Sequence, residues 1–99
     1  MRKITVAVVG LSFGMEFVPI YRDHPGINKV YVCDFSKDLL ETAKMRYDIP
    51  EECCTEEFES LLSNPEIDAI HIVTPPATHA DYSVKVLNAG KHCACTIPM

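Results

Sequence analysis

The sequence predicts an α/β fold of the Rossmann type, a doubly wound parallel sheet of about five strands. Short, almost wholly apolar runs rich in β-branched residues alternate with helical segments, which is typical of parallel strands covered on both faces. Glycine ends the first of these runs and aspartate ends the second. With 99 residues, 47% of them hydrophobic, the chain is expected to form one domain, residues 1–99, around one core.

Four strands are placed by their apolar runs, at residues 4–9, 29–33, 69–73 and 92–96. The first, Ile-Thr-Val-Ala-Val-Val, is followed directly by Gly10, and the second by Asp34. Between them the pattern predicts helices, so that each strand returns parallel to the last by a right-handed crossover. This alternation places helices on both faces of the sheet.

Two helices are predicted in the first half of the chain. One runs from about residue 14 to 23 and ends at His24-Pro25-Gly26; its buried face is expected to carry Phe13, Phe17, Ile20 and Tyr21. The other runs from Ser36, a plausible N-cap, to about residue 47. Its inward residues are expected to be Leu39, Leu40 and Ala43.

Two more helices are predicted in the second half. Thr55 is expected to cap a short helix through Leu62, with Glu56 and Glu57 in the first turn, where the helix dipole favours negative charge. Thr78 and Asp81 have the spacing of a capping box and begin a helix that runs to about residue 88 before Gly90. Its inner stripe is expected to be Ala80, Val84 and Leu87.

In a doubly wound sheet, ligands bind beyond the carboxyl ends of the strands, where the strand order reverses. The loop after the first strand, Gly-Leu-Ser-Phe-Gly-Met, keeps the first glycine of the G-x-G-x-x-G fingerprint as Gly10. Ser12 and Met15 replace the second and third glycines, and Met15 is expected to push the helix away from the strand. A glycine turn after a strand is common, so this loop alone leaves dinucleotide binding open.

Asp34 strengthens the prediction of a dinucleotide site. It ends the second strand about 24 residues after Gly10, where the fingerprint expects an acid that binds the ribose hydroxyls. A carboxylate there repels a 2′-phosphate, so NAD is favoured over NADP, although nearby Lys37 blurs this preference. The alternative is that Asp34 simply caps the following helix.

The loop at residues 74–79 is expected to line the nicotinamide side of the site. It contains Thr74, Pro75 and His79, and its prolines fix the backbone. His79 is a candidate for contact with the ribose or for acid–base chemistry, and a solvent-facing histidine in a first helical turn is an equal alternative. His71, inside an apolar strand, is interpreted as structural.

Composition narrows the partners and the location. A formal net charge of -5 argues against a nucleic-acid partner, and the glutamates around residues 51–59 are interpreted as a solvated helix face. No run approaches the roughly 18 apolar residues of a membrane span. None of the five cysteines lies in a C-x-x-C pair, so no metal site is predicted, and buried free thiols in a reducing cytoplasm are expected.

These residues together resemble a known family. The run VGLSFGMEFVPIY at residues 9–21, then Cys33-Asp34, then TPPATH at 74–79 and GKH at 90–92, resemble the Gfo/Idh/MocA family of glucose–fructose oxidoreductase and inositol dehydrogenase. The resemblance implies hydride transfer between NAD or NADP and a sugar, cyclitol or related polyol. It also implies a pyrophosphate contact by Gly10, Leu11, Ser12 and Phe13, a ribose contact by Asp34, and a nicotinamide-side contact by Thr74, Pro75 and His79.

Two departures from the family pattern limit this prediction. Thr96-Ile97-Pro98 stands where the family has Glu-Lys-Pro with an assisting lysine, and the chain ends before the last Rossmann strand and the substrate domain. We therefore expect cofactor binding without turnover by this chain alone, a small polar substrate only in a longer parent, and no catalytic residue here. Residues 92–96 would form an exposed sheet edge, which predicts a homo-oligomer. A non-catalytic nucleotide-binding module and a bare interaction domain remain the alternatives.

Overall fold

The computed structural model describes residues 3–73 and 76–95. Five parallel strands form one sheet in the order β3-β2-β1-β4-β5. Their bounds are β1 Ile4–Val9, β2 Ile27–Cys33, β3 Cys54–Thr55, β4 Ala69–Ile72 and β5 His92–Cys95. The predicted doubly wound parallel sheet is confirmed, with β1 at its centre and the strand order reversing between β1 and β4.

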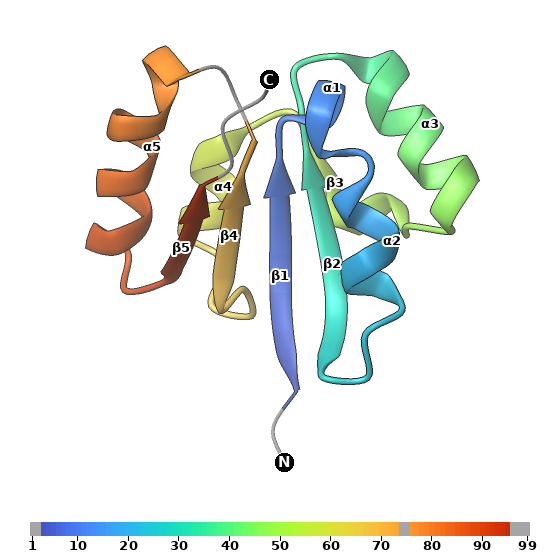
Figure 1. The fold of residues 1–99 in the computed structure, drawn as a ribbon, viewed down its shortest axis with the longest axis horizontal. Coiled ribbons are helices and arrows are strands. Elements are labelled where there is room, and N and C mark those ends of the chain that lie inside the picture. Colours follow the sequence, from blue (N-terminus) through green and yellow to red (C-terminus); the bar gives the residue numbers. More distant parts are fainter. Residues whose placement is uncertain (1–2, 74–75, 96–99) are drawn as a thin grey trace.

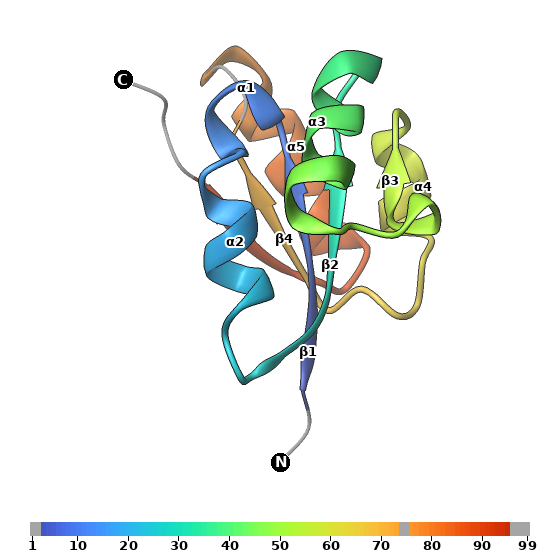
Figure 2. The ribbon, with the colours of Figure 1, turned by 90° about the vertical axis from the view of Figure 1, so that its right-hand side faces the viewer.

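Helical segments connect the strands. Their bounds are α1 Leu11–Gly14, α2 Phe17–Arg22, α3 Lys37–Tyr47, the 3-10 turn η1 Glu51–Cys53, α4 Phe58–Leu62 and α5 Pro76–Asn88. All strands point the same way, and α1 begins directly beyond the tip of β1 (Figure 1). Figure 2 shows α2 and α4 on opposite sides of the sheet. The crossovers therefore cover both faces, as the alternating sequence pattern predicts.

Ring stacking and side-chain contacts fix the two helical layers. On one face, the rings of Phe17 and Tyr21 from α2 lie 4.6 and 5.7 Å from the ring of His71 on β4. On the other face, Phe58 of α4 stacks on Tyr82 of α5, with ring centroids 4.1 Å apart and planes 12° apart. The core between these layers consists largely of the strands themselves: the side chains of residues 5–9 and 30–33 are all buried.

The structure corrects the first predicted helix. Instead of one helix over residues 14–23, α1 ends at Gly14 and α2 begins at Phe17. Ile20, placed on the inner face by the sequence pattern, is exposed, whereas Val18 is fully buried. Phe17 and Tyr21 pack against the core as predicted, so Ile20 is the residue placed wrongly, and the side chain of Phe13 lies outside the described part of the structure.

The last two helices also differ from the prediction. Thr55 lies in β3, and α4 begins at Phe58 with Glu57 at its N-cap, so Glu56 and Glu57 precede the helix. Helix α5 begins at Pro76, which places Thr78 inside the helix and rules out its role in a capping box. Val84 and Leu87 are exposed, and Tyr82 and Val86 face inward among the described side chains of α5. The side chain of Ala80, also predicted to face inward, lies outside the described part.

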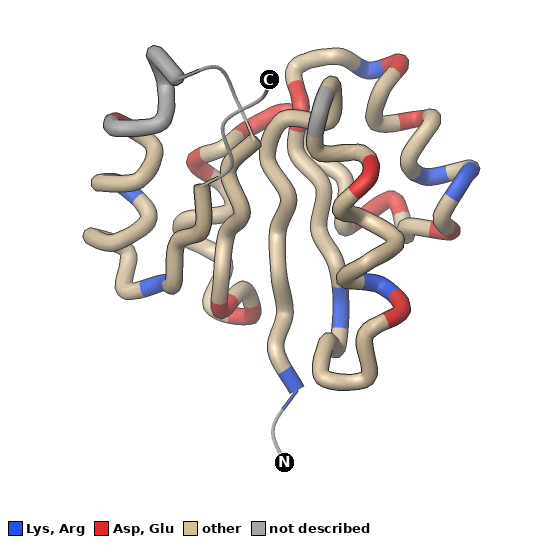
Figure 3. Tube along the Cα trace, in the orientation of Figure 1, with Lys and Arg blue, Asp and Glu red and all other residues tan. Residues whose placement is uncertain are grey.

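Charged residues are interspersed on the surface. Along α3, for example, both signs occur, with Lys37 and Lys44 positive and Asp38 and Glu41 negative. Figure 3 shows both signs along the outer helices. Within residues 3–73 and 76–95, no helix has the length and apolar content needed to cross a bilayer.

Candidate cofactor-binding site

The loop after β1 makes a tight turn at Gly10. This glycine has φ 92° and ψ 89°, in the left-handed region that side chains with a Cβ avoid. Its N–H donates to the carbonyl of Cys33 at the end of β2 (2.9 Å), and its carbonyl accepts the N–H of Gly14 (2.9 Å). The turn thus joins the ends of two neighbouring strands and starts α1 at the carboxyl edge of the sheet.

Asp34 holds this turn from the neighbouring strand end. Its Oδ2 accepts the N–H of Leu11 at 2.7 Å, and its Oδ1 accepts the N–H of Ser36 at 2.8 Å. Ser36 is the N-cap of α3, and its hydroxyl accepts the N–H of Leu39 at 3.3 Å. One carboxylate therefore connects the glycine turn to the start of α3. The alternative interpretation, in which Asp34 caps this helix, is wrong because the N-cap is Ser36.

Gly14 makes the close approach between α1 and the sheet. A Cβ on Gly14 would lie 2.9 Å from Cγ1 of Val8 and 3.3 Å from Cγ2 of Val73. Met15, expected to hold the helix away from the strand, instead has its side chain in the core with 9% exposed. That expectation is wrong because the chain turns after Gly14, and Gly14 itself makes the close contact with the sheet. The glycine at the fifth position of the loop is the sequence feature that could have predicted this contact.

Two further side chains flank Asp34. Phe35, which the sequence analysis did not single out, is 77% exposed immediately after Asp34. Lys37, in the first turn of α3, is 82% exposed and lies 3.9 Å from a carboxylate oxygen of Glu56. An aromatic residue directly after a strand-ending acid is the feature that could have identified Phe35 from the sequence.

Several predicted site residues lie outside the described part of the structure. Thr74 and Pro75 lie outside it entirely, as do residues 96–99, which include Ile97. For Phe13 and His79 only the backbone is described. Of the nine predicted cofactor-binding residues, the structure thus brings together Gly10, Leu11, Ser12, Asp34 and Lys37 around the tips of β1 and β2. Ser12 is exposed in α1.

His71 lies in the core away from this edge. Its side chain is 5% exposed, and its Nδ1 is 2.8 Å from the hydroxyl of Tyr21. Burial lowers the pKa of His71. This environment agrees with the structural role that the sequence suggested.

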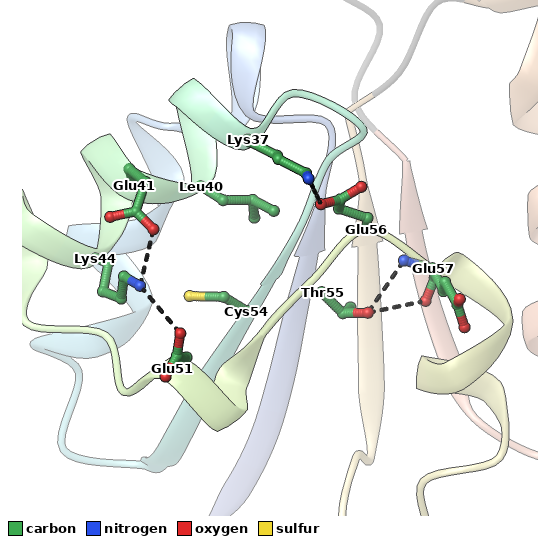
Figure 4. A pocket seen from close by; sticks show the side chains of 9 residues that line it. All are labelled: Lys37, Leu40, Glu41, Lys44, Glu51, Cys54, Thr55, Glu56 and Glu57. Atoms are coloured by element: carbon green, nitrogen blue, oxygen red, sulfur yellow. Dashed lines mark hydrogen bonds and ion pairs between the residues drawn. The ribbon is translucent and has the colours of Figure 1, made fainter.

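A cleft of about 500 Å³ lies beside the candidate site, between α3 and the segment from η1 to the start of α4 (Figure 4). Lys44 binds Glu41 at 2.9 Å and Glu51 at 3.7 Å there, and Thr55 accepts the N–H of Glu57 at 3.0 Å. These charges are already paired with one another, and the cleft lies outside the turn at Gly10. We therefore place the candidate site at the strand tips and not in this cleft.

The cysteines are less buried than expected. All five are free; Cys33 and Cys53 are buried, Cys54 and Cys93 are half-buried, and Cys95 is exposed. Burial, assisted by the charge of Asp34, raises the pKa of Cys33 to about 12. Cys33 therefore remains an inert thiol at the end of β2 at neutral pH.

The fold and this edge define the class of the protein. A parallel sheet that reverses its order beside β1, a left-handed glycine turn into a helix at the tip of β1, and an acid at the tip of β2 together define a dinucleotide-binding domain. The comparison with protein families agrees. Residues 4–99 match the Gfo/Idh/MocA oxidoreductase family, described as having an NAD-binding Rossmann fold, and the chain belongs to this family.

Known relatives illustrate the range of that family. The 1-carboxy-3-chloro-3,4-dihydroxycyclohexa-1,5-diene dehydrogenase of Comamonas testosteroni is 32% identical over 98% of this chain and 24% of its own length. The structure of myo-inositol 2-dehydrogenase from Lactobacillus plantarum superimposes with a TM-score of 0.83 at 25% identity, over 95% of this chain and 28% of that one.

A second structure contains NADP, a phosphorylated cofactor. It is a variant of KijD10, a 3-ketoreductase from Actinomadura kijaniata, in complex with TDP-benzene and NADP. Its TM-score is 0.81 at 22% identity, over 95% of this chain and 30% of that one. The chain thus spans about a quarter to a third of the length of these three proteins.

Proposed function

We propose that this chain binds NAD across the tips of β1 and β2, as the cofactor-binding part of an oxidoreductase that transfers hydride to or from a sugar, cyclitol or related polyol. The observation that supports it most directly is the carboxylate of Asp34, held by the N–H groups of Leu11 and Ser36. A carboxylate has about four lone-pair positions, so two remain for the adenosine ribose hydroxyls.

The glycine turn fits the pyrophosphate. Backbone N–H groups in the first turn of a helix have no acceptor within the helix. The N–H of Leu11 already donates to Asp34, so the proposed donors to the phosphates are the N–H groups of Ser12 and Phe13, with the exposed Ser12 hydroxyl beside them. Gly10 and Leu11 then shape the turn. Phe35, exposed next to Asp34, offers an apolar surface for the adenine ring.

The preference for NAD over NADP rests on charge. A 2′-phosphate on the ribose would face the carboxylate of Asp34, and two negative charges in contact repel each other. Lys37 is the nearby cation, but it is largely exposed and lies within 3.9 Å of Glu56. We propose that its charge is too solvated to reverse the preference. On the nicotinamide side, we propose that the cofactor contacts Thr74, Pro75 and His79.

The remaining parts of the proposal concern the whole protein. The relatives named above act on hydroxylated rings, and the chain spans 24% and 28% of their lengths, so we propose that substrate is held by parts that this chain does not contain. The chain alone would then bind cofactor without turnover. We also propose a reducing, cytoplasmic location, in keeping with five free cysteines, and self-association through the exposed edge of β5.

Calorimetric titration with NAD and NADP in parallel tests the proposal. We expect NAD to bind at least tenfold more tightly than NADP, and Asp34→Ala to weaken NAD binding at least tenfold. Asp38→Ala removes a carboxylate from the first turn of α3 and serves as the matched control, with binding unchanged.

Because Asp34 also holds the glycine turn, circular dichroism must show that the Asp34→Ala variant folds. Phe35→Ala, at an exposed position, provides a second test that leaves the core intact, and we expect weaker binding of both cofactors. If neither cofactor binds the wild-type chain, the proposal is wrong and an interaction module is favoured. If Asp34→Ala folds and binds NAD normally, the assignment of Asp34 to the ribose is wrong.

A further inference from the structure

Two thiols stand side by side on β5, which β4 separates from β1 and the turn at Gly10. The sulfurs of Cys93 and Cys95 are 3.8 Å apart, because residues two apart in a strand point to the same face. The hydroxyl of Ser83 on α5 lies 3.0 Å from the sulfur of Cys95. Cys95 is exposed and Cys93 half-buried, so solvent reaches this pair, which we call the β5 dithiol.

The spacing of the β5 dithiol matches that of two ligands on one metal ion. Zinc–thiolate bonds are about 2.3 Å long and their geometry is tetrahedral. Two sulfurs on one such ion therefore stand about 3.8 Å apart, the edge of a tetrahedron with that bond length. The observed separation of 3.8 Å equals this value, so an ion would be held without movement of the strand.

The same geometry is poor for a disulfide. A disulfide needs the sulfurs about 2.05 Å apart and Cα atoms 4.4–6.8 Å apart. Alternate residues of an extended strand have Cα atoms about 6.6 Å apart, at the upper end of that range. Closing the bond would bring the sulfurs from 3.8 Å to about 2.05 Å, within a strand whose residues pair with β4 from Ala69↔His92 to Ile72↔Cys95.

We propose that Cys93 and Cys95 form a two-sulfur site for a thiophilic divalent cation of the Zn²⁺ or Cd²⁺ type. Both thiols lose their protons on binding, two metal–sulfur bonds form, and water fills the remaining positions. Ser83 positions the pair, because its hydroxyl donates to the Cys95 thiolate once the proton has left. In the described part of the chain no three His, Cys, Asp or Glu side chains are grouped to hold a metal, which makes the site open and exchangeable.

Cysteine binds a metal ion as the thiolate, so metal binding releases the thiol protons and becomes stronger as the pH rises. Proton release gives the experiment a readout that does not depend on activity or on cofactor binding.

The test is titration of the reduced 99-residue chain with Cd²⁺, following sulfur-to-metal charge-transfer absorption and proton release in weak buffer. We expect one ion per chain, with signal and proton release lost in Cys93→Ser and in Cys95→Ser. Cys54→Ser, which removes another half-buried thiol, is the matched control and should leave both readouts unchanged. Ser83→Ala should bind several-fold more weakly.

Other outcomes would overturn the site. Undiminished binding in both Cys93→Ser and Cys95→Ser, each shown to be folded by circular dichroism, would exclude the β5 dithiol. A stoichiometry of one Cd²⁺ per two chains would show that the ion is bound by four sulfurs from two copies and not by one β5 dithiol. Absence of binding together with fast formation of a Cys93–Cys95 disulfide in dilute peroxide would assign the pair to redox chemistry instead.

Discussion

Strands β1 and β5 run parallel in the same sheet yet occupy very different surroundings. Five of the six residues of β1 are buried, whereas no residue of β5 is buried. Strand β1 pairs with β2 on one side and β4 on the other, and within the described residues β5 pairs with β4 alone. Position in the sheet, more than apolar content, separates the centre of this molecule from its edge.

The comparison shows where each kind of chemistry is located. At the centre, hydrogen bonds hold the backbone of Gly10 and the carboxylate of Asp34 in one arrangement, as a preorganised binding site requires. At the edge, Cys95 is exposed and Cys93 is half-buried. Three experiments of decreasing expected effect test whether the centre and the edge differ as described.

The largest difference is expected for a pair of leucine truncations. Leu11 in α1 is 0% exposed and Leu87 on α5 is 63% exposed. We expect Leu11→Ala to lower the free energy of unfolding by about 2–5 kcal/mol, because it leaves a cavity in a core that is closely packed. Leu87→Ala should change it by less than about 0.5 kcal/mol. Urea unfolding measures the free energy of unfolding of both variants. Equal losses of stability would contradict the difference between a buried and an exposed leucine.

A smaller difference is expected for two glycines. In Gly14→Ala the new methyl would meet Cγ1 of Val8 at 2.9 Å, and relieving that overlap is expected to cost about 1–3 kcal/mol. Gly90 has φ +77° with nothing within 4 Å of an added Cβ, so Gly90→Ala costs only backbone strain, about 1 kcal/mol. Thermal unfolding compares them. A larger loss in Gly90→Ala would show that packing at Gly14 is looser than the distances indicate.

The smallest effect concerns pH. Burial lowers the pKa of His71 in the folded chain below that of the unfolded chain, so protonation favours unfolding. Stability from this residue is therefore fully present above about pH 6.5 and is lost as the pH falls toward the lowered pKa. The slope is at most about 1.4 kcal/mol per pH unit. Denaturant unfolding measured between about pH 5 and pH 7 should show a shallower dependence of stability on pH in His71→Gln than in the wild type, and an unchanged dependence would contradict the prediction.

Much of the sheet was predictable because its strands are nearly pure apolar runs. Ile4–Val9 was placed without error, and β2 and β4 differ from their predicted bounds by one or two residues at an end. Strand β5 agrees over His92–Cys95, and Thr96 lies outside the described residues. Strand β3 was missed because Cys54–Thr55 is only two residues long, which is too short to show an apolar pattern in the sequence. Val84 and Leu87 were wrongly placed on the inner face of α5, because the stack of Tyr82 on Phe58, a contact distant in sequence, turns another face of the helix inward.

The candidate site was predictable in its chemistry but not in its connections. Asp34 follows from its position after an apolar strand, about 24 residues beyond Gly10. That its two oxygens hold Leu11 and Ser36 depends on the twist that brings two strand ends together. The close approach at Gly14 depends on where α1 stops, which the helical period of residues 11–22 does not reveal.

The placement of β1 between β2 and β4 has a kinetic consequence. Partners such as Val6 and Val30 are near in sequence, whereas Val6 and Ala69 pair across most of the chain, and Thr5 bonds Asp68 over a separation of 63 residues. Closing a long loop has a larger entropic cost than closing a short one. We expect the β1–α2–β2 unit to assemble first and β4 to dock late, so the reversal of strand order that creates the ligand-binding edge is completed only in the final stage of folding.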